Sequence, residues 1–353
     1  MKQKKRNIKN LIQWILACIV AFVLANVLIL PYWYAPGWIP RAGCSTSAIY
    51  HAGEFVINGY EGYGYSHVDF RGYLNEDLPV AQDHVLVLGC SHTKGTEVPM
   101  GKRFSSLLND KLSGGDDSIL YAYNLSIDGF YFPAIVHGFK AAIDEMATTN
   151  AVVIEIPTTE FSPEEFEGKY YPKHYDYTQA GSWLYYSLPT KTRVQIRLKE
   201  VLPLVSLYLS KQLVFEQGTK KPFIYEVPEP VKEEALDFTK EEYQTAIDNA
   251  LFSICFFWGE DLIIYYHPEA TIAEDGSLKI KESITTPWFK EVCEKYNVTF
   301  VDATEAFLEA YEQDYIVPYG FSNTAPGEGH LNEDGHRISA ELIYEALKGG
   351  NEE

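Results

Sequence analysis

The stretch of sequence that decides the fold is HVLVLGCSHTKG, residues 84–95. Its first half reads as a buried strand, because the chain is apolar without interruption from Val85 to Leu88. Gly89 allows a sharp turn, and a helix after it would hold the side chain of Ser91 at the carboxyl edge of a sheet. Backbone amides at the start of that helix would face a developing oxyanion. The stretch predicts a serine nucleophile; the alternative is an ordinary strand-to-helix turn whose serine only caps the helix.

A partner for this serine occurs near the other end of the chain. The run GEGHLNEDGH covers residues 327–336 and leads into a helix pattern. Because a parallel sheet brings distant loops to one edge, a serine and a histidine far apart in sequence can meet there. We expect His330 to be the base and Glu328 to be the carboxylate that orients its ring. His336 falls in the first turn of the helix, where a capping or packing role is expected.

The body of the chain alternates strand-like and helix-like runs, which is typical of a parallel sheet covered on both faces. The predicted strands are residues 85–88, 120–124, 152–156, 262–266 and 298–302. Two helices are predicted from apolar stripes, one with Phe104, Leu107, Leu108 and Leu112, and one capped by Asn332 with Ile338, Leu342 and Ala346. The Glu274-Asp275-Gly276 turn predicts a hairpin. The fold class is therefore α/β with a central parallel sheet.

Three motifs resemble the sequence blocks of the SGNH (GDSL-type) hydrolase family. Residues 89–95 are similar to its Gly-Asp-Ser-x-Thr-x-Gly block, with Cys90 in place of the aspartate. Residues 124–129 and 330–336 resemble its second and last blocks. The resemblance implies a three-layer, flavodoxin-like fold, Ser91 as nucleophile and His330 as base. It also implies an oxyanion hole made by the backbone amides of Ser91 and Gly129.

The chain departs from the family's pattern at two further positions. Gly327 stands where the family has its triad acid, three residues before the histidine, and Glu328 is the nearest substitute. Thr159 stands where the family has an oxyanion-hole asparagine. Losing one such donor costs about 10²- to 10³-fold in rate unless the threonine hydroxyl takes its place. We expect Thr159 to assist in the oxyanion hole.

The N-terminus predicts a membrane anchor. Residues 1–10 form a basic tail, and residues 11–31 form an apolar run long enough to cross a bilayer. Positive charge before the run places the N-terminus in the cytoplasm and the rest of the chain outside. A cleaved signal peptide, with Val23 and Ala25 at the small-residue positions, is the alternative. Residues 32–79 read as an aromatic, irregular lead-in segment, and residues 80–350 as the hydrolase domain. An insertion at about 161–250 is expected to form a lid or a substrate-side insertion.

Composition excludes several functions. The net charge of −20 argues against binding nucleic acid, because phosphate contacts need clustered Lys and Arg. Five cysteines without paired spacing predict neither a disulfide framework nor a zinc site, and no cofactor is expected. An apolar fraction of 46% allows a sizeable core.

Together, the serine, the histidine and the predicted anchor point to an extracytoplasmic esterase or O-acyltransferase. The family resemblance implies acyl groups on cell-surface polysaccharide as the substrate, and a membrane partner that hands over acyl groups is a further expectation for a transferase. The alternative is a catalytically degenerate SGNH-like subunit that binds polysaccharide or serves assembly. The substitutions at residues 159 and 327 favour that alternative.

Overall fold

The structure is a computed structural model that describes residues 2–29, 55–58, 61–76, 84–113, 121–146, 149–167, 190–191, 194, 204, 236–259 and 261–349. Its α-helices are α1 (Lys2–Leu24), α3 (Ser91–Lys94), α4 (Phe104–Ser113), α5 (Phe132–Glu145), α9 (Lys240–Phe257), α10 (Thr285–Lys295), α11 (Thr304–Asp314) and α12 (Glu333–Gly349). Shorter helical segments are the π-helix η1 (Ala25–Ile29) and the 3₁₀ helices η2 (Met100–Lys102) and η3 (Pro163–Phe166). The strands are β1 (Phe55–Asn58), β2 (Gly64–His67), β3 (His84–Leu88), β4 (Tyr121–Asn124), β5 (Thr149–Ile156), β6 (Asp261–Tyr266), β7 (Ala270–Ile272), β8 (Leu278–Ile280) and β9 (Thr299–Asp302).

The centre of the fold is a parallel sheet. Among the described residues it has five strands in the order β4-β3-β5-β6-β9, and every neighbouring pair is parallel. In chain order this is 2-1-3-4-5, the flavodoxin-like arrangement. All five predicted strands are confirmed, with shifts of one to three residues at their ends. The strand β3 comes first in the chain and lies beside β5 in the sheet. The serine turn directly follows β3.

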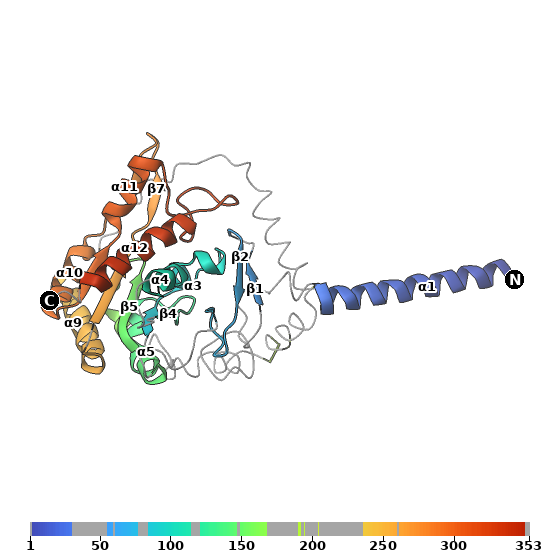
Figure 1. Cartoon of the computed structure of the whole chain (residues 1–353), viewed down its shortest axis with the longest axis horizontal. Coiled ribbons are helices and arrows are strands. Elements are labelled where there is room, and N and C mark those ends of the chain that lie inside the picture. The colour runs from blue at the N-terminus through green and yellow to red at the C-terminus, as the bar shows by residue number, and fades with distance from the viewer. Residues whose placement is uncertain are drawn as a thin grey trace.

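Helices cover both faces of the sheet (Figure 1), because alternate strand residues point to opposite sides. One face carries Leu86, Leu88, Val152, Ile154, Leu262 and Ile264, which pack with side chains of α5, α9 and α10. The other face carries Val85, Val87, Ala151, Val153, Ile263 and Tyr265, which pack with side chains of α4, α11 and α12. The predicted three-layer fold is confirmed.

The ends of the two predicted helices are set by their sequences. The first, α4, begins at Phe104, the first residue of its apolar stripe. The second, α12, begins after Asn332, whose Oδ1 accepts the amide N–H groups of Asp334 and Gly335 at 3.0 Å each. This is the capping bond expected of an asparagine before a helix.

The N-terminal part contains one helix that is long and apolar enough to cross a membrane. The candidate span is Asn7–Leu28, with a mean hydropathy of 2.5. In Figure 1, α1 projects away from the α/β body. The lead-in segment differs from the irregular structure predicted for it, because β1 and β2 pair as an antiparallel hairpin.

The predicted lid lies largely outside the described residues, which include 161–167, 190–191, 194, 204 and 236–250 of that segment. Its C-terminal part forms the start of α9, a helix of the covering layer that packs against α5 and α10. The predicted hairpin near Asp275 is confirmed as the antiparallel pair β7–β8.

Candidate active site

The serine turn is a compact unit between β3 and α3. Ser91 is the first residue of α3, and its carbonyl accepts the N–H of Gly95 at 2.9 Å. Gly89 is required for close packing, because a Cβ atom there would lie 2.1 Å from Thr93 Oγ1 and 2.4 Å from Glu155 Oε2. Gly95 ends the helix in the left-handed region at φ 57°. The local sequence thus holds Ser91 at the carboxyl edge of the sheet, as predicted.

The structure brings His330 to this serine. His330 Nε2 lies 2.9 Å from Ser91 Oγ, within hydrogen-bond distance. Two contacts fix the loop that carries His330. The carbonyl oxygen of His330 accepts the N–H of Gly320 at 3.2 Å, and the next residue, Leu331, is fully buried. Residues 91 and 330 therefore meet because the loops after β3 and before α12 share one edge of the sheet.

The carboxylate on the far side of the imidazole differs from the prediction. Glu61 Oε2 lies 2.8 Å from His330 Nδ1, and Glu61 Oε1 accepts the backbone N–H of His330 at 2.5 Å. Glu328, predicted for this role, is exposed. Gly329 explains the exchange: its φ is +83°, and a Cβ atom there would lie 1.8 Å from Glu61 Oε1. The absence of a side chain at residue 329 therefore leaves room for Glu61 beside His330.

Glu61 comes from the turn of the β1–β2 hairpin, far before the serine in the sequence. Sequence reasoning missed it, because no carboxylate motif marks this part of the aromatic lead-in segment. The only local signal is the glycine pattern NGYEGYG at residues 58–64. Gly62 and Gly64 sit where any side chain would strike the backbone of residues 96–98, so they let the hairpin lie against the loop after α3.

Charges around His330 suit it to receive a proton. Burial lowers its pKa, but the hydrogen bond to Glu61 and the negative charges of Glu97, Glu61 and Asp128 outweigh burial, so the pKa lies above the ordinary 6.5. Burial raises the pKa of Glu61, but its hydrogen bonds from His330 lower it below the ordinary 4.5. Glu61 is therefore ionised at neutral pH, where it accepts Nδ1–H and leaves Nε2 free to accept the serine proton.

Gly129, a predicted oxyanion donor, lies in a turn that packs against the turn of Ser91. Gly129 adopts φ +75° in the turn after β4, and Asp128 beside it pairs with Lys94 of α3, with an Oδ2–Nζ distance of 2.6 Å. This pair ties the Gly129 turn to the helix that begins at Ser91. Ile127 strengthens the same junction, because its N–H donates to the Gly89 carbonyl at 3.1 Å. The amides of residues 91 and 129 thus belong to two turns that pack against each other.

Thr159 does not fit its predicted role. Its side chain is fully buried, and its Oγ1 lies 2.9 Å from the hydroxyls of both Thr285 and Thr286. A hydroxyl that has no exposed surface cannot touch a substrate oxygen. Thr159 therefore offers no side-chain donor to the Ser91 site, because its hydroxyl lies in the contact between the loop after β5 and α10.

The described residues contain no group of three or more His, Cys, Asp or Glu side chains arranged to hold a metal ion. Four of the five cysteines are described, and they are free thiols, with Cys90 and Cys293 buried. Cys44 lies outside the described residues.

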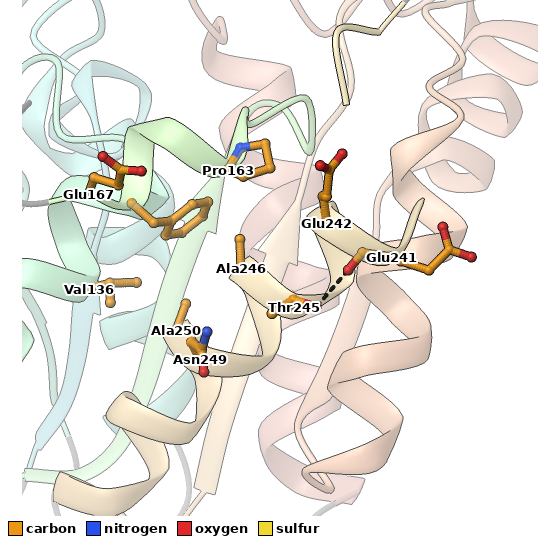
Figure 2. A pocket seen from close by; sticks show the side chains of 10 residues that line it. Val136, Pro163, Glu167, Glu241, Glu242, Thr245, Ala246, Asn249 and Ala250 are labelled. Carbon is orange, nitrogen blue, oxygen red and sulfur yellow. Dashed lines mark hydrogen bonds between the residues drawn. The ribbon is translucent and has the colours of Figure 1, made fainter. Parts of the chain in front are cut away.

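A separate cavity of about 560 Å³ lies between α5, η3 and α9 (Figure 2). Its walls are apolar near Val136 and Phe166 and carry Glu167, Glu241 and Glu242 at other points. It shares no residue with the Ser91 site.

Comparison with known proteins gives likeness of structure alone. No family model matches the chain, and no curated protein matches it in sequence. A two-domain esterase active on acetylated mannans is 11% identical, with a TM-score of 0.42 over 78% of this chain and 51% of that one, so the chain spans about half of its length. A catalytic variant of an acetylxylan esterase from Geobacillus stearothermophilus is 13% identical, with a TM-score of 0.40 over 77% of this chain and 96% of that one. A member of the lipolytic G-D-S-L family from Veillonella parvula is 14% identical, with a TM-score of 0.35 over 75% of this chain and 98% of that one.

The fold can be assigned from the chain's own topology. The strand order is flavodoxin-like. Ser91 follows the first strand of the sheet, and His330 precedes the last helix. The chain has a three-layer, flavodoxin-like α/β fold that brings Ser91 and His330 together at one edge of its sheet.

Proposed function

We propose that the chain is a serine-dependent acyl ester hydrolase or O-acyltransferase of the SGNH type. The observation that carries the proposal is the hydrogen-bonded series Ser91–His330–Glu61, with distances of 2.9 Å and 2.8 Å. A nucleophile, a base and an orienting carboxylate in this order are the arrangement by which serine enzymes transfer acyl groups.

The residues divide the reaction into two balanced steps. Ser91 Oγ attacks the acyl carbonyl while its proton passes to His330 Nε2, and Glu61 stabilises the imidazolium through Nδ1–H. The amides of Ser91 and Gly129 stabilise the oxyanion. His330 then returns the proton to the departing alcohol, which leaves an acyl ester on Ser91. In the second step His330 takes a proton from water or an acceptor alcohol, the new oxygen attacks the acyl group, and the proton returns to Ser91.

The substrate follows from the predicted placement of the domain. The basic tail and the candidate span Asn7–Leu28 favour a domain held at the outer face of a membrane. Such a domain meets cell-surface polysaccharide first, so we assign O-acyl groups of that polymer as the substrate. Water as acceptor gives an esterase, and a sugar hydroxyl gives a transferase, which would draw its acyl groups from a membrane partner.

The test uses the full chain in detergent with a small acyl ester, such as p-nitrophenyl acetate. We expect turnover that Ser91→Ala and His330→Ala both abolish, while each variant keeps the thermal stability of the wild type. Adding an acceptor polysaccharide then separates the two reactions, because a transferase yields acylated polymer and an esterase yields free acid. A folded wild type without turnover, but with retained glycan binding, would favour the degenerate binding subunit, a reading that the buried Thr159 hydroxyl supports.

A further inference from the structure

A pair of buried polar side chains lies directly beneath the serine turn. On β5, residues 151 and 153 face the α12 side of the sheet, and Glu155 continues this alternation. On β6, residues 263 and 265 face the same side, and His267 follows them. Both side chains are completely buried. An apolar face of the core is thus replaced, at the edge that carries Ser91, by a carboxylate and an imidazole.

The Glu155 carboxylate is bonded to the turn and to the histidine. Its Oε2 accepts the backbone N–H of Cys90 at 2.9 Å and the hydroxyl of Thr93 at 2.8 Å. Its Oε1 lies 2.7 Å from His267 Nε2. Burial raises the pKa of Glu155, but the hydrogen bond with His267 and its charge outweigh burial and lower the pKa to about 2. A buried charge is stable only when it is paired and hydrogen-bonded, and here every contact serves that purpose.

The hydrogen bonds of His267 hold its ring on both sides. Its Nε2 faces an ionised carboxylate and must donate. Its Nδ1 lies 2.7 Å from the Tyr319 oxygen, which also lies 2.8 Å from the carbonyl oxygen of Pro268 and 3.1 Å from that of His267. Both ring nitrogens of His267 are therefore engaged, one by Glu155 and one by Tyr319.

We propose that Glu155 and His267 form a buried, hydrogen-bonded carboxylate–imidazole pair that positions the serine turn. The pair holds Cys90 and Thr93, the residues on either side of Ser91 and His92, so it fixes the direction of Ser91 Oγ toward His330. Glu155 and His267 are positioning residues, because neither is exposed to substrate. This positioning role rests on the proposed function of Ser91, and it names the residues that align the Ser91 side chain.

The pair also reaches the base through His92. The His92 ring centroid lies 4.9 Å from that of His267 and 4.8 Å from that of His330. Burial and the His267 charge hold the pKa of His92 well below its usual range, so this ring stays neutral. Its Nδ1 accepts the N–H of Leu331, the residue after His330, at 3.3 Å. His92 therefore buttresses the base without competing for its proton.

Three substitutions at one position test the positioning role. Glu155→Ala frees the turn, and we expect kcat to fall on the order of 10²-fold, the usual cost of a displacement of about 1 Å, with KM within twofold of wild type. Glu155→Gln should restore kcat to within about 10-fold of wild type, because its amide oxygen accepts the same two bonds and a neutral His267 accepts from its amide nitrogen. Glu155→Asp keeps the charge but lacks one methylene of reach, so it should behave like the alanine variant.

The matched control is Tyr265→Phe, which removes another buried hydrogen bond on the same face, the one from Tyr265 to Ser339 Oγ at 2.6 Å. We expect it to lower thermal stability and leave kcat unchanged. A merely structural Glu155 would give the pattern of this control, with wild-type kcat in the folded fraction of every variant. That result, or an aspartate variant as active as the glutamine variant, would overturn the positioning role.

The pair is also tested without reference to turnover. In the full chain labelled with ¹⁵N-histidine, we expect one imidazole Nε2–H signal that is protected from exchange with solvent, because both side chains of the pair are buried, and we expect Glu155→Gln to lose this signal. Absence of the signal in the wild type would overturn the hydrogen-bonded pair even if the enzyme is active. Its presence in a protein without esterase or transferase activity would overturn the proposed function and leave the pair standing.

Discussion

Glu61→Gln is the substitution that most sharply separates the observed site from the one predicted from sequence. In the structure, Glu61 accepts two hydrogen bonds from one residue, the backbone N–H and Nδ1–H of His330. A glutamine has the same shape but only one accepting oxygen. If this oxygen keeps the backbone N–H, the amide nitrogen faces Nδ1 and donates to it. The ring proton then moves to Nε2, which can no longer accept the proton of Ser91.

The size of the effect follows from this change of tautomer. The reverse orientation of the glutamine would place its NH₂ group against the backbone N–H, at a cost of about 1–3 kcal/mol for donors left unpaired. The wrong tautomer therefore dominates. The equivalent loss in serine proteases of another fold reduces kcat by roughly 10⁴-fold. His330 and Glu61 keep 27% and 14% of their side-chain surface exposed, and water can partly replace the lost acceptor. We expect a fall in kcat of about 10³- to 10⁴-fold, or about 4–5.5 kcal/mol.

The assay is the hydrolysis of p-nitrophenyl acetate by the full chain in detergent, with kcat and KM determined separately. Glu328→Gln is the matched control, because it makes the same chemical change at the residue that the local sequence favours, and we expect its kcat to stay within twofold of wild type. Equal activity of Glu61→Gln and wild type, or a large loss in Glu328→Gln, would refute the assignment of the acid.

Four further outcomes follow from the same geometry. Gly329→Ala should reduce kcat about as much as Glu61→Gln, because its Cβ would occupy the place of Glu61 Oε1; a wild-type rate would show that the contact is unimportant. Thr159→Val should leave kcat within about twofold but lower the free energy of unfolding by about 1–3 kcal/mol in urea titrations, since it removes the buried hydrogen bonds with the hydroxyls of Thr285 and Thr286; a loss of kcat at unchanged stability would return Thr159 to the oxyanion hole. The kcat/KM of wild type should increase with pH over a range above pH 6.5, because only neutral His330 is a base and its pKa is raised. Glu61→Gln removes a negative charge beside His330, so the pH-dependent rise of its residual activity should move to lower pH; an unchanged pH profile would show that Glu61 does not raise the pKa of His330. Full-length protein should stay in membranes after alkaline carbonate extraction with its N-terminal peptide intact, whereas a mature N-terminus just after Ala25 would identify a cleaved signal peptide.

Much of the fold could be predicted from sequence, because strand patterns are local. The run from Val85 to Leu88 is apolar on both faces, and the structure buries both faces. The meeting of residues 91 and 330 was also predictable, since a parallel sheet collects its loops at one edge. The capping bond of Asn332 needed only the residues that follow it.

The triad acid could not be predicted, because its position depends on contacts between segments distant in sequence. Near His330 the sequence offers Glu328, but in the structure this side chain is exposed, and Glu61 from the distant β1–β2 hairpin contacts His330 instead. Thr159 is similar, because its direction is decided by residues of α10 more than a hundred positions later. By contrast, Glu155 had a visible signal, since a carboxylate inside the apolar run VVIEI must be paired when the strand is buried.

The central claim is that Ser91 is a nucleophile activated by His330, and a fluorophosphonate probe tests it most directly. We expect one phosphonyl adduct in the full-length protein, located by mass spectrometry on the peptide that contains Ser91, and no adduct in folded His330→Ala. Folded wild-type protein without an adduct, or with the adduct on another serine, would contradict the account.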